Sequence, residues 1–116
     1  DDTPRRRRIF VATGTGIAPF LAEFDQGVRA DDVLLLGLAT TSEDPTTRLG
    51  TPLPRVIHCV SRENTPGTFH GRVTHYLRAH GIDTRADYYV CGSPLMVADV
   101  TRLIRDAGGH VHTESF

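Results

Sequence analysis

The sequence lacks the long apolar segments that mark membrane and secreted proteins. No apolar run approaches the roughly 20 residues that a membrane-spanning helix requires. Residues 1–5 contain no apolar core of the kind that a secretion signal carries. A chain of 116 residues, 39% hydrophobic and 23% charged, has the size and composition of one ordinary globular domain. We therefore expect a cytoplasmic protein without membrane contact.

The chain also has little net charge. Its formal charge is −1, so no overall positive field draws it to nucleic acid or to an anionic membrane. The four consecutive arginines at 5–8 follow two aspartates and directly precede an apolar run. We expect residues 1–8 to be a solvated inter-domain linker and residues 9–116 to form the domain.

Cysteine is scarce, which limits redox and metal chemistry. Cys59 and Cys91 each lie in an apolar run, where a thiol usually packs as a small hydrophobic group. They lack the C-x-x-C spacing of a zinc site or a redox dithiol. The six histidines have no carboxylate or thiol at a spacing that would complete a metal site, so we expect no metal.

Short apolar runs alternate with helix-like segments, a pattern that is typical of a parallel sheet covered by helices. The later helix has the strongest signals, with Ser93 as N-cap and Pro94 at its first position. Prolines and few apolar residues predict a loop over 40–54, where a parallel crossover normally carries a helix. The expected helices cover residues 18–26, 72–80 and the segment from 94 onward, and the expected strands cover residues 9–13, 33–39, 55–61, 87–91 and 110–116.

A glycine-rich turn, Gly14-Thr15-Gly16, follows the first expected strand. Such a turn before a helix exposes backbone N–H groups and the positive end of the helix dipole, which suits a pyrophosphate. The third glycine of the Rossmann fingerprint is absent, with Pro19 near its place, and the Lys-Ser/Thr pair of a P-loop is missing. On the residues alone, a tight turn without a ligand stays an equal alternative.

A second turn, Cys91-Gly92-Ser93-Pro94, follows the fourth expected strand. If the strand order reverses between the two turns, they border a crevice at the carboxyl edge of the sheet, where α/β proteins bind ligands. The G-x-S-x-G motif of serine hydrolases is absent, so hydrolase chemistry has little support.

Three motifs together resemble the ferredoxin–NADP reductase family, and the bacterial ferredoxin (flavodoxin)–NADP reductases most of all. They are residues 14–20 (GTGIAPF), residues 91–96 (CGSPLM) and a C-terminal Glu114-Ser115-Phe116, in the family's order at the expected strand ends. The resemblance spans nearly the whole chain. It implies an α/β, Rossmann-like nucleotide-binding domain with a five-stranded parallel sheet in the order 3-2-1-4-5, flanked by helices.

The resemblance also implies NADP as the nucleotide, with NAD possible. NADP-using members hold the 2′-phosphate with a Ser-Arg pair after the third strand, here Ser61-Arg62, and bacterial members add an arginine ten residues later, here Arg72. Two guanidinium groups suit a dianionic phosphate. Some bacterial members also carry an arginine at the end of the second strand, where this chain has Ala39-Thr40.

Three further positions take their roles from the resemblance. It places Cys91 beside the nicotinamide for hydride transfer and Glu114 near flavin and nicotinamide, which makes these two the catalytic candidates. Phe116 would cover the flavin ring by stacking. The other cofactor-binding positions that the turn motifs imply are Thr13, Gly14, Thr15, Gly16, Gly92, Pro94 and Met96.

The Arg-x-aromatic-Ser motif of the family's flavin site does not occur in the chain. We therefore expect FAD in a flavin-binding domain of a longer parent, with ferredoxin or flavodoxin as electron partner and little activity in this chain alone. The arginine run would then offer an alternative docking patch for such an acidic partner. Two other functions stay open: an NADH-linked reductase component of an oxygenase, and a catalytically silent nucleotide-binding module.

Overall fold

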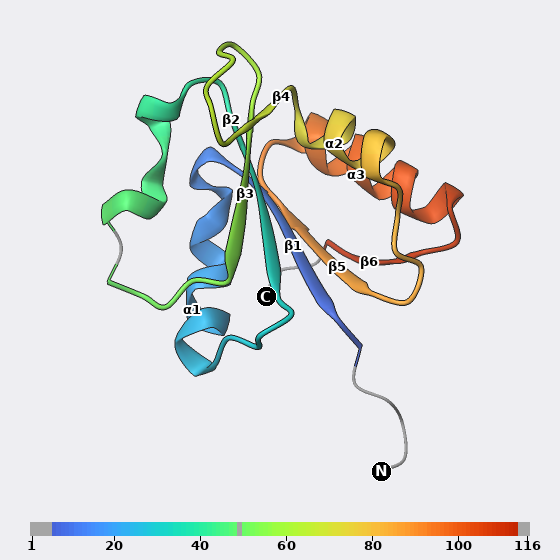
Figure 1. The fold of residues 1–116 in the computed structure, drawn as a ribbon. Coiled ribbons are helices and arrows are strands. Elements are labelled where there is room, and N and C mark those ends of the chain that lie inside the picture. The colour runs from blue at the N-terminus through green and yellow to red at the C-terminus, as the bar shows by residue number, and fades with distance from the viewer. Residues whose placement is uncertain (1–5, 49, 114–116) are drawn as a thin grey trace.

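The computed structural model describes residues 6–48 and 50–113. These residues form one parallel sheet between two layers of helix, with α1 on one face and α2 and α3 on the other (Figure 1). The strand order is β4-β3-β2-β1-β5-β6. The strands are β1 (Arg8–Thr13), β2 (Val33–Leu38), β3 (Arg55–Val60), β4 (Phe69–His70), β5 (Asp87–Cys91) and β6 (His110–His112), and the helices are α1 (Ala18–Gln26), α2 (Val73–His80) and α3 (Pro94–Asp106).

The apolar runs form strands because each face of the sheet buries alternate residues. Every residue of β2 is buried, as expected for a central parallel strand covered on both faces. Phe10, Leu34 and Leu36 pack with Phe20 and Phe24 of α1. The alternate positions of the same strands face α2 and α3, in a cluster that includes Val11, Leu35, Val73, Val90 and Val100.

The capping signals near residue 93 act as expected. The Ser93 hydroxyl accepts a hydrogen bond from the Met96 N–H at 3.4 Å, and Pro94 occupies the first turn of α3. Met96, Val100 and Ile104 form the buried face of this helix. The carboxyl end of β5 and the start of α3 are therefore fixed relative to the core.

The expected count of five strands is wrong, because a sixth strand lies at the edge of the sheet. The five expected strands keep the implied order 3-2-1-4-5, and β4 extends the sheet beside β3 through the pairs Cys59–Phe69 and Val60–His70. A two-residue strand has no apolar periodicity of its own. β4 forms because the chain after β3 returns alongside the outer edge of β3 and pairs with it.

The described residues of the 40–54 segment form no α-helix, in line with the expected loop, but they are not without regular structure. They contain two short 3₁₀ turns, Thr41–Glu43 and Pro45–Arg48. Asp44 accepts hydrogen bonds from the backbone N–H and the hydroxyl of Thr46 and lies 2.8 Å from Nε2 of His58. This contact ties the loop to β3.

Arg6, Arg7 and Arg8 of the arginine run each have a partner on the fold, although Arg7 is exposed and only Arg8 is largely shielded from solvent. Arg8 already belongs to β1, and its guanidinium pairs with the buried carboxylate of Asp32. Arg6 pairs with Asp87 at 3.1 Å, and Arg7 donates to the Asp31 carbonyl at 3.0 Å. Tertiary partners, invisible in the local sequence, hold these side chains on the fold.

No helix in the described ranges is both long enough and apolar enough to cross a bilayer.

Candidate functional site

The two glycine turns meet at the carboxyl edge of the sheet. β1 ends at Thr13 and β5 ends at Cys91, and these strands are direct neighbours. The Thr13 hydroxyl accepts a hydrogen bond from the Ser93 N–H at 3.1 Å, which links the first turn to the second. Strand order reverses here, since β2 lies on the other side of β1, so the turns lie at the switch point where open α/β sheets bind ligands.

Glycine is required in both turns because their backbones touch. A Cβ on Gly16 would lie 2.6 Å from the Cys91 carbonyl oxygen and 2.6 Å from the Gly92 Cα. A Cβ on Gly92 would collide with the Thr13 hydroxyl, and Gly92 also has φ of +144°, a conformation that favours glycine. The two turns, residues 13–16 and 91–94, thus form one continuous surface, which we call the rim.

Gly14 differs from these two glycines. It has φ of +47°, and a Cβ there would meet nothing within 4 Å. Its backbone borders open space at the start of the 3₁₀ turn Gly14–Ile17, which leads directly into α1. A backbone without a side chain at the start of a helix can approach an anion closely.

A pocket of about 380 Å³ opens beside this rim, on the face of the sheet that α2 and α3 cover. Its volume lies in the range of small-molecule sites. The pocket joins residues from β1, β2, β3, α2 and α3, which places it across the carboxyl ends of the strands. Among the residues expected to bind cofactor, those that line it are Thr13, Gly14, Ser61, Arg62, Arg72 and Met96.

The two expected phosphate-binding arginines enter the pocket from different segments. Arg62 follows β3, where its N–H donates to the Ala39 carbonyl at 2.9 Å and keeps the chain along the end of β2. Within residues 6–48 and 50–113, the Arg62 guanidinium has no hydrogen bond or ion pair, and its side chain is exposed. It is available to an anion.

Arg72 occupies the N-cap position of α2. Its backbone N–H donates to Nδ1 of His75 at 3.0 Å, so Nδ1 is the unprotonated ring nitrogen in this contact. The preceding glycine, Gly71, has φ of +145° and donates its N–H to the Val60 carbonyl at 2.8 Å. These bonds direct the chain from the sheet edge into α2 and bring Arg72 to the pocket.

Two acidic residues that the sequence analysis missed also line the pocket, Glu43 and Asp99. Glu43 lies in the first 3₁₀ turn after β2, and its carboxylate accepts a hydrogen bond from the Thr40 hydroxyl at 3.3 Å. An acidic residue soon after the second strand was the available signal, because such residues hold the ribose in NAD-binding folds. The loop prediction for residues 40–54 gave no reason to place Glu43 near the arginines.

Glu63 has a positioning role in the same region. Its carboxylate accepts the Thr41 N–H at 2.6 Å. This bond joins the segment that carries Arg62 to the 3₁₀ turn that carries Glu43. The arginine and the pocket glutamate are therefore held by one short link between the loops after β2 and β3.

The thiol that lines this pocket is Cys59, and Cys91 is not among the lining residues. Cys59 is fully buried, and burial raises its pKa to about 12, so it stays a neutral thiol. Cys91 is half-buried and packs with the cluster on the α1 face of the sheet. Both cysteines are free.

The other expected site residues fall in three places. Gly16, Gly92 and Pro94 build the rim but do not line the pocket. Thr15 belongs to the turn Gly14–Ile17. Glu114 and Phe116 lie outside the described residues. No three His, Cys, Asp or Glu side chains gather into a possible metal site in the described ranges.

A family model described as an oxidoreductase NAD-binding domain matches residues 10–102, which is most of the chain. The matched range includes both turns and both pocket arginines. No curated protein matches the chain.

Proposed function

Because the chain belongs to the oxidoreductase NAD-binding domain family, we propose that it is the NADP(H)-binding half of a flavin oxidoreductase of the ferredoxin–NADP reductase type. The family makes it a nucleotide-binding domain of an oxidoreductase. The choice of NADP rests on one observation: Arg62 and Arg72 line the same pocket as the Gly14 turn.

The adenosine end of the nucleotide would occupy this pocket. A 2′-phosphate is a dianion with several acceptor oxygens, and each guanidinium can donate two parallel hydrogen bonds to it. Ser61 adds a hydroxyl donor at the pocket wall. Glu43 and Asp99 match the two arginines in number, so the case for a phosphate rests on the paired hydrogen bonds that the guanidinium groups can donate and not on an excess of positive charge.

Glu43 also supports NAD as a second candidate nucleotide. A carboxylate at this place can accept hydrogen bonds from the ribose hydroxyls, as acidic residues do in NAD-binding folds, and it repels a 2′-phosphate. We therefore propose NADP as the preferred nucleotide and Glu43 as the residue that limits the preference.

The pyrophosphate and the nicotinamide of the bound nucleotide would lie along the rim. The open backbone at Gly14 and the start of α1 suit the pyrophosphate. Cys91 lies at the far side of the rim, with its carbonyl against Gly16. A nicotinamide there would have the Cys91 side chain beside it, in a position to orient the ring. The nicotinamide itself supplies the hydride chemistry.

We further propose that a flavin-binding domain of a longer parent carries FAD and completes the enzyme. On the face of the sheet that carries α1, two rings stack: Tyr89 lies in β5, two residues before Cys91, and His112 lies opposite it in β6, with ring centroids 4.9 Å apart and planes 20° apart. His112 is 48% exposed, so this stack is accessible to a flat aromatic partner. Ferredoxin or flavodoxin would exchange electrons with the complete parent.

The proposal is tested by measuring NADP and NAD affinities of the chain by calorimetry. Loss of a charged hydrogen bond costs about 1.5–3 kcal/mol, so Arg62→Ala should weaken NADP binding about 10- to 100-fold and leave NAD nearly unchanged. Arg102→Ala is the matched control, since Arg102 is exposed on α3 and lines neither pocket described in this protein.

Equal losses for both nucleotides would show that Arg62 does not bind the 2′-phosphate. Tighter binding of NAD than NADP by the unmodified chain would favour the NADH-linked oxygenase reductase. Nucleotide binding without hydride transfer in the complete parent would identify a silent module.

A further inference from the structure

A second cavity, of about 480 Å³, lies at the opposite edge of the sheet from the nucleotide pocket. It is on the same face, under the carboxyl end of α2, and its floor is formed by apolar residues near the amino ends of the central strands, namely Ile9, Val33, Leu35 and Ile57. None of its lining residues lines the nucleotide pocket. The two cavities are separate sites.

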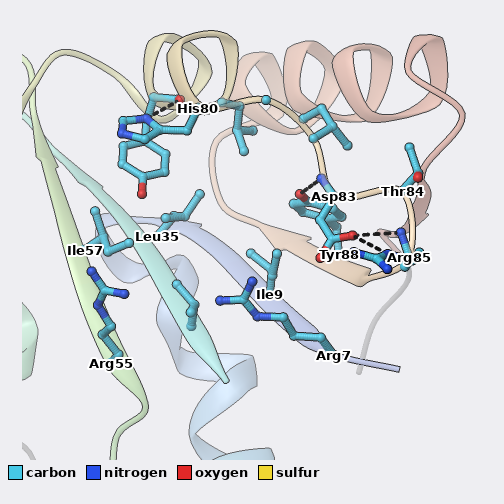
Figure 2. Close-up of a pocket in the computed structure, with 15 residues that line it drawn as sticks. Arg7, Ile9, Leu35, Arg55, Ile57, His80, Asp83, Thr84, Arg85 and Tyr88 are labelled. Carbon is cyan, nitrogen blue, oxygen red and sulfur yellow. Dashed lines mark hydrogen bonds and ion pairs between the residues drawn. The ribbon is translucent and has the colours of Figure 1, made fainter. Parts of the chain in front are cut away.

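Three guanidinium groups border this cavity (Figure 2). The strand register shows why two of them share a face: Ile9 pairs with Val33, and Val33 pairs with Arg55. Side chains alternate along a strand, so Arg7 lies on the same face as Ile9, and Arg55 on the same face as Ile57. In Figure 2, the Arg7 side chain extends over this floor towards the side on which Arg55 lies, and Arg85 lies on the other side beside Asp83.

The positive charge at the cavity is only partly neutralised. Asp83 is the single carboxylate among the lining residues; it accepts the backbone N–H of Arg85 at 2.9 Å and lies 3.9 Å from Nε of the same residue, so it offsets one of the three guanidinium charges. Arg7 donates to a carbonyl, which carries no net charge. Arg55 makes no hydrogen bond or ion pair with any residue that the structure describes. Like charges around one cavity repel, and an anion between them removes that repulsion.

A buried donor adds to these cations. Tyr88 is 1% exposed and lines the cavity. Its hydroxyl oxygen accepts the Asp83 N–H at 2.9 Å, and in the described part of the chain no acceptor receives its own O–H. Burial raises the pKa of Tyr88, so the hydroxyl keeps its proton.

We propose that this cavity binds a small polyanion, a compact molecule in which two or more carboxylate or phosphate groups are covalently linked. Guanidinium groups bind both kinds of oxyanion through paired charged hydrogen bonds. A cavity of this size holds a small organic molecule, whereas a single inorganic ion would leave most of it empty. The apolar floor would contact the carbon frame where the molecule has one.

The proposal is tested by titrating the isotope-labelled chain with citrate at constant ionic strength and following backbone amide resonances. Acetate at three times the molar concentration matches the carboxylate count without linking the groups. Pyrophosphate, compared with orthophosphate, serves as the phosphate arm. Citrate or pyrophosphate should shift the amides of Ile57, Ile82 and Tyr88 in a saturable way, and acetate and orthophosphate should not.

Removal of one cation should weaken the binding. Arg55→Gln should lower citrate or pyrophosphate affinity about tenfold, because one set of charged hydrogen bonds is lost. Arg85→Gln should act in the same direction, and this 94% exposed side chain can be replaced without disturbing the core. Arg102→Gln controls for the loss of one charge and should change nothing.

Several results would overturn the proposal: saturable binding by neither polyanion, equal binding of acetate and citrate, or affinity unchanged in both the Arg55 and the Arg85 variants. Shifts confined to the amides of Arg62 and Arg72 would also overturn it, because the anion would then occupy the nucleotide pocket. The outcome is independent of the NADP assignment, since no residue is shared between the sites.

Discussion

The contact between the two turns makes Gly16→Ala the most informative single substitution. The new Cβ would lie 2.6 Å from the Cys91 carbonyl oxygen and from the Gly92 Cα, and 2.9 Å from the Cys91 carbonyl carbon. All three are backbone atoms, so no side-chain rotation relieves the overlap. The turns must move apart until the contacts reach ordinary van der Waals distance.

The expected cost follows from this geometry. Overpacking of a tight contact usually costs about 1–3 kcal/mol, and backbone neighbours place this case at the upper end of that range. For a domain of this size, each kcal/mol lowers Tm by about 4 °C, so Gly16→Ala should lower Tm by about 10 °C. Nucleotide affinity should also fall, because the rim that borders the pocket is displaced.

Thermal unfolding followed by circular dichroism measures the effect, with Gly50→Ala as the matched control. A Cβ on Gly50 would meet nothing within 4 Å, and its φ is not in the left-handed region. Gly50→Ala should therefore be neutral or slightly stabilising. If the two variants had the same Tm, the two turns could not be in the close contact described above.

Three further predictions concern charge and thiol chemistry. Glu43→Gln should raise NADP affinity about threefold by removing an exposed carboxylate from the phosphate end of the pocket, and unchanged calorimetric affinity would exclude Glu43 from nucleotide selection. Asp32→Asn should destabilise the fold by about 3 kcal/mol in urea unfolding, because it leaves the Arg8 guanidinium without its buried partner. Burial opposes ionisation of Asp32, but the hydrogen bonds from Arg8 and Arg29 hold its pKa below the usual value. The contribution of Asp32 to the free energy of unfolding is therefore complete above about pH 4 and is lost as the pH falls further. The Asn variant should lose this part of the dependence of stability on acid pH. Iodoacetamide at pH 8 should alkylate Cys91 well before Cys59, whose pKa is about 12, and mass spectrometry showing equal rates would contradict the burial of Cys59.

The strands and their caps could be predicted from sequence because their signals are local. β2 is a continuous apolar run, and a parallel strand buried on both faces requires that composition. Ser93 and Pro94 indicate the start of α3, because an N-cap hydrogen bond and a proline in the first turn both act within one helical turn. The glycine turns can be predicted in the same way, because the need for glycine at the end of a strand is a property of the turn itself.

The pairing of charges could not be predicted, because it joins residues far apart in the chain. Arg8 meets Asp32 only after β1 and β2 pair, so nothing in the local sequence marks Asp32 as the partner of this arginine. The sixth strand depends on an edge that β3 provides. Neither feature has a local pattern that distinguishes it from a linker or a turn.

The sequence by itself determined the sheet, the helices and the two glycine turns, because these follow from periodicity and from backbone requirements of neighbouring residues. Only the tertiary structure decided which side chains share a cavity. It brought Glu43 to the two arginines, placed Cys59 in the pocket wall, and gathered Arg7, Arg55 and Arg85 around a second cavity. Such neighbours are set by strand order and register, which are properties of the whole packed chain.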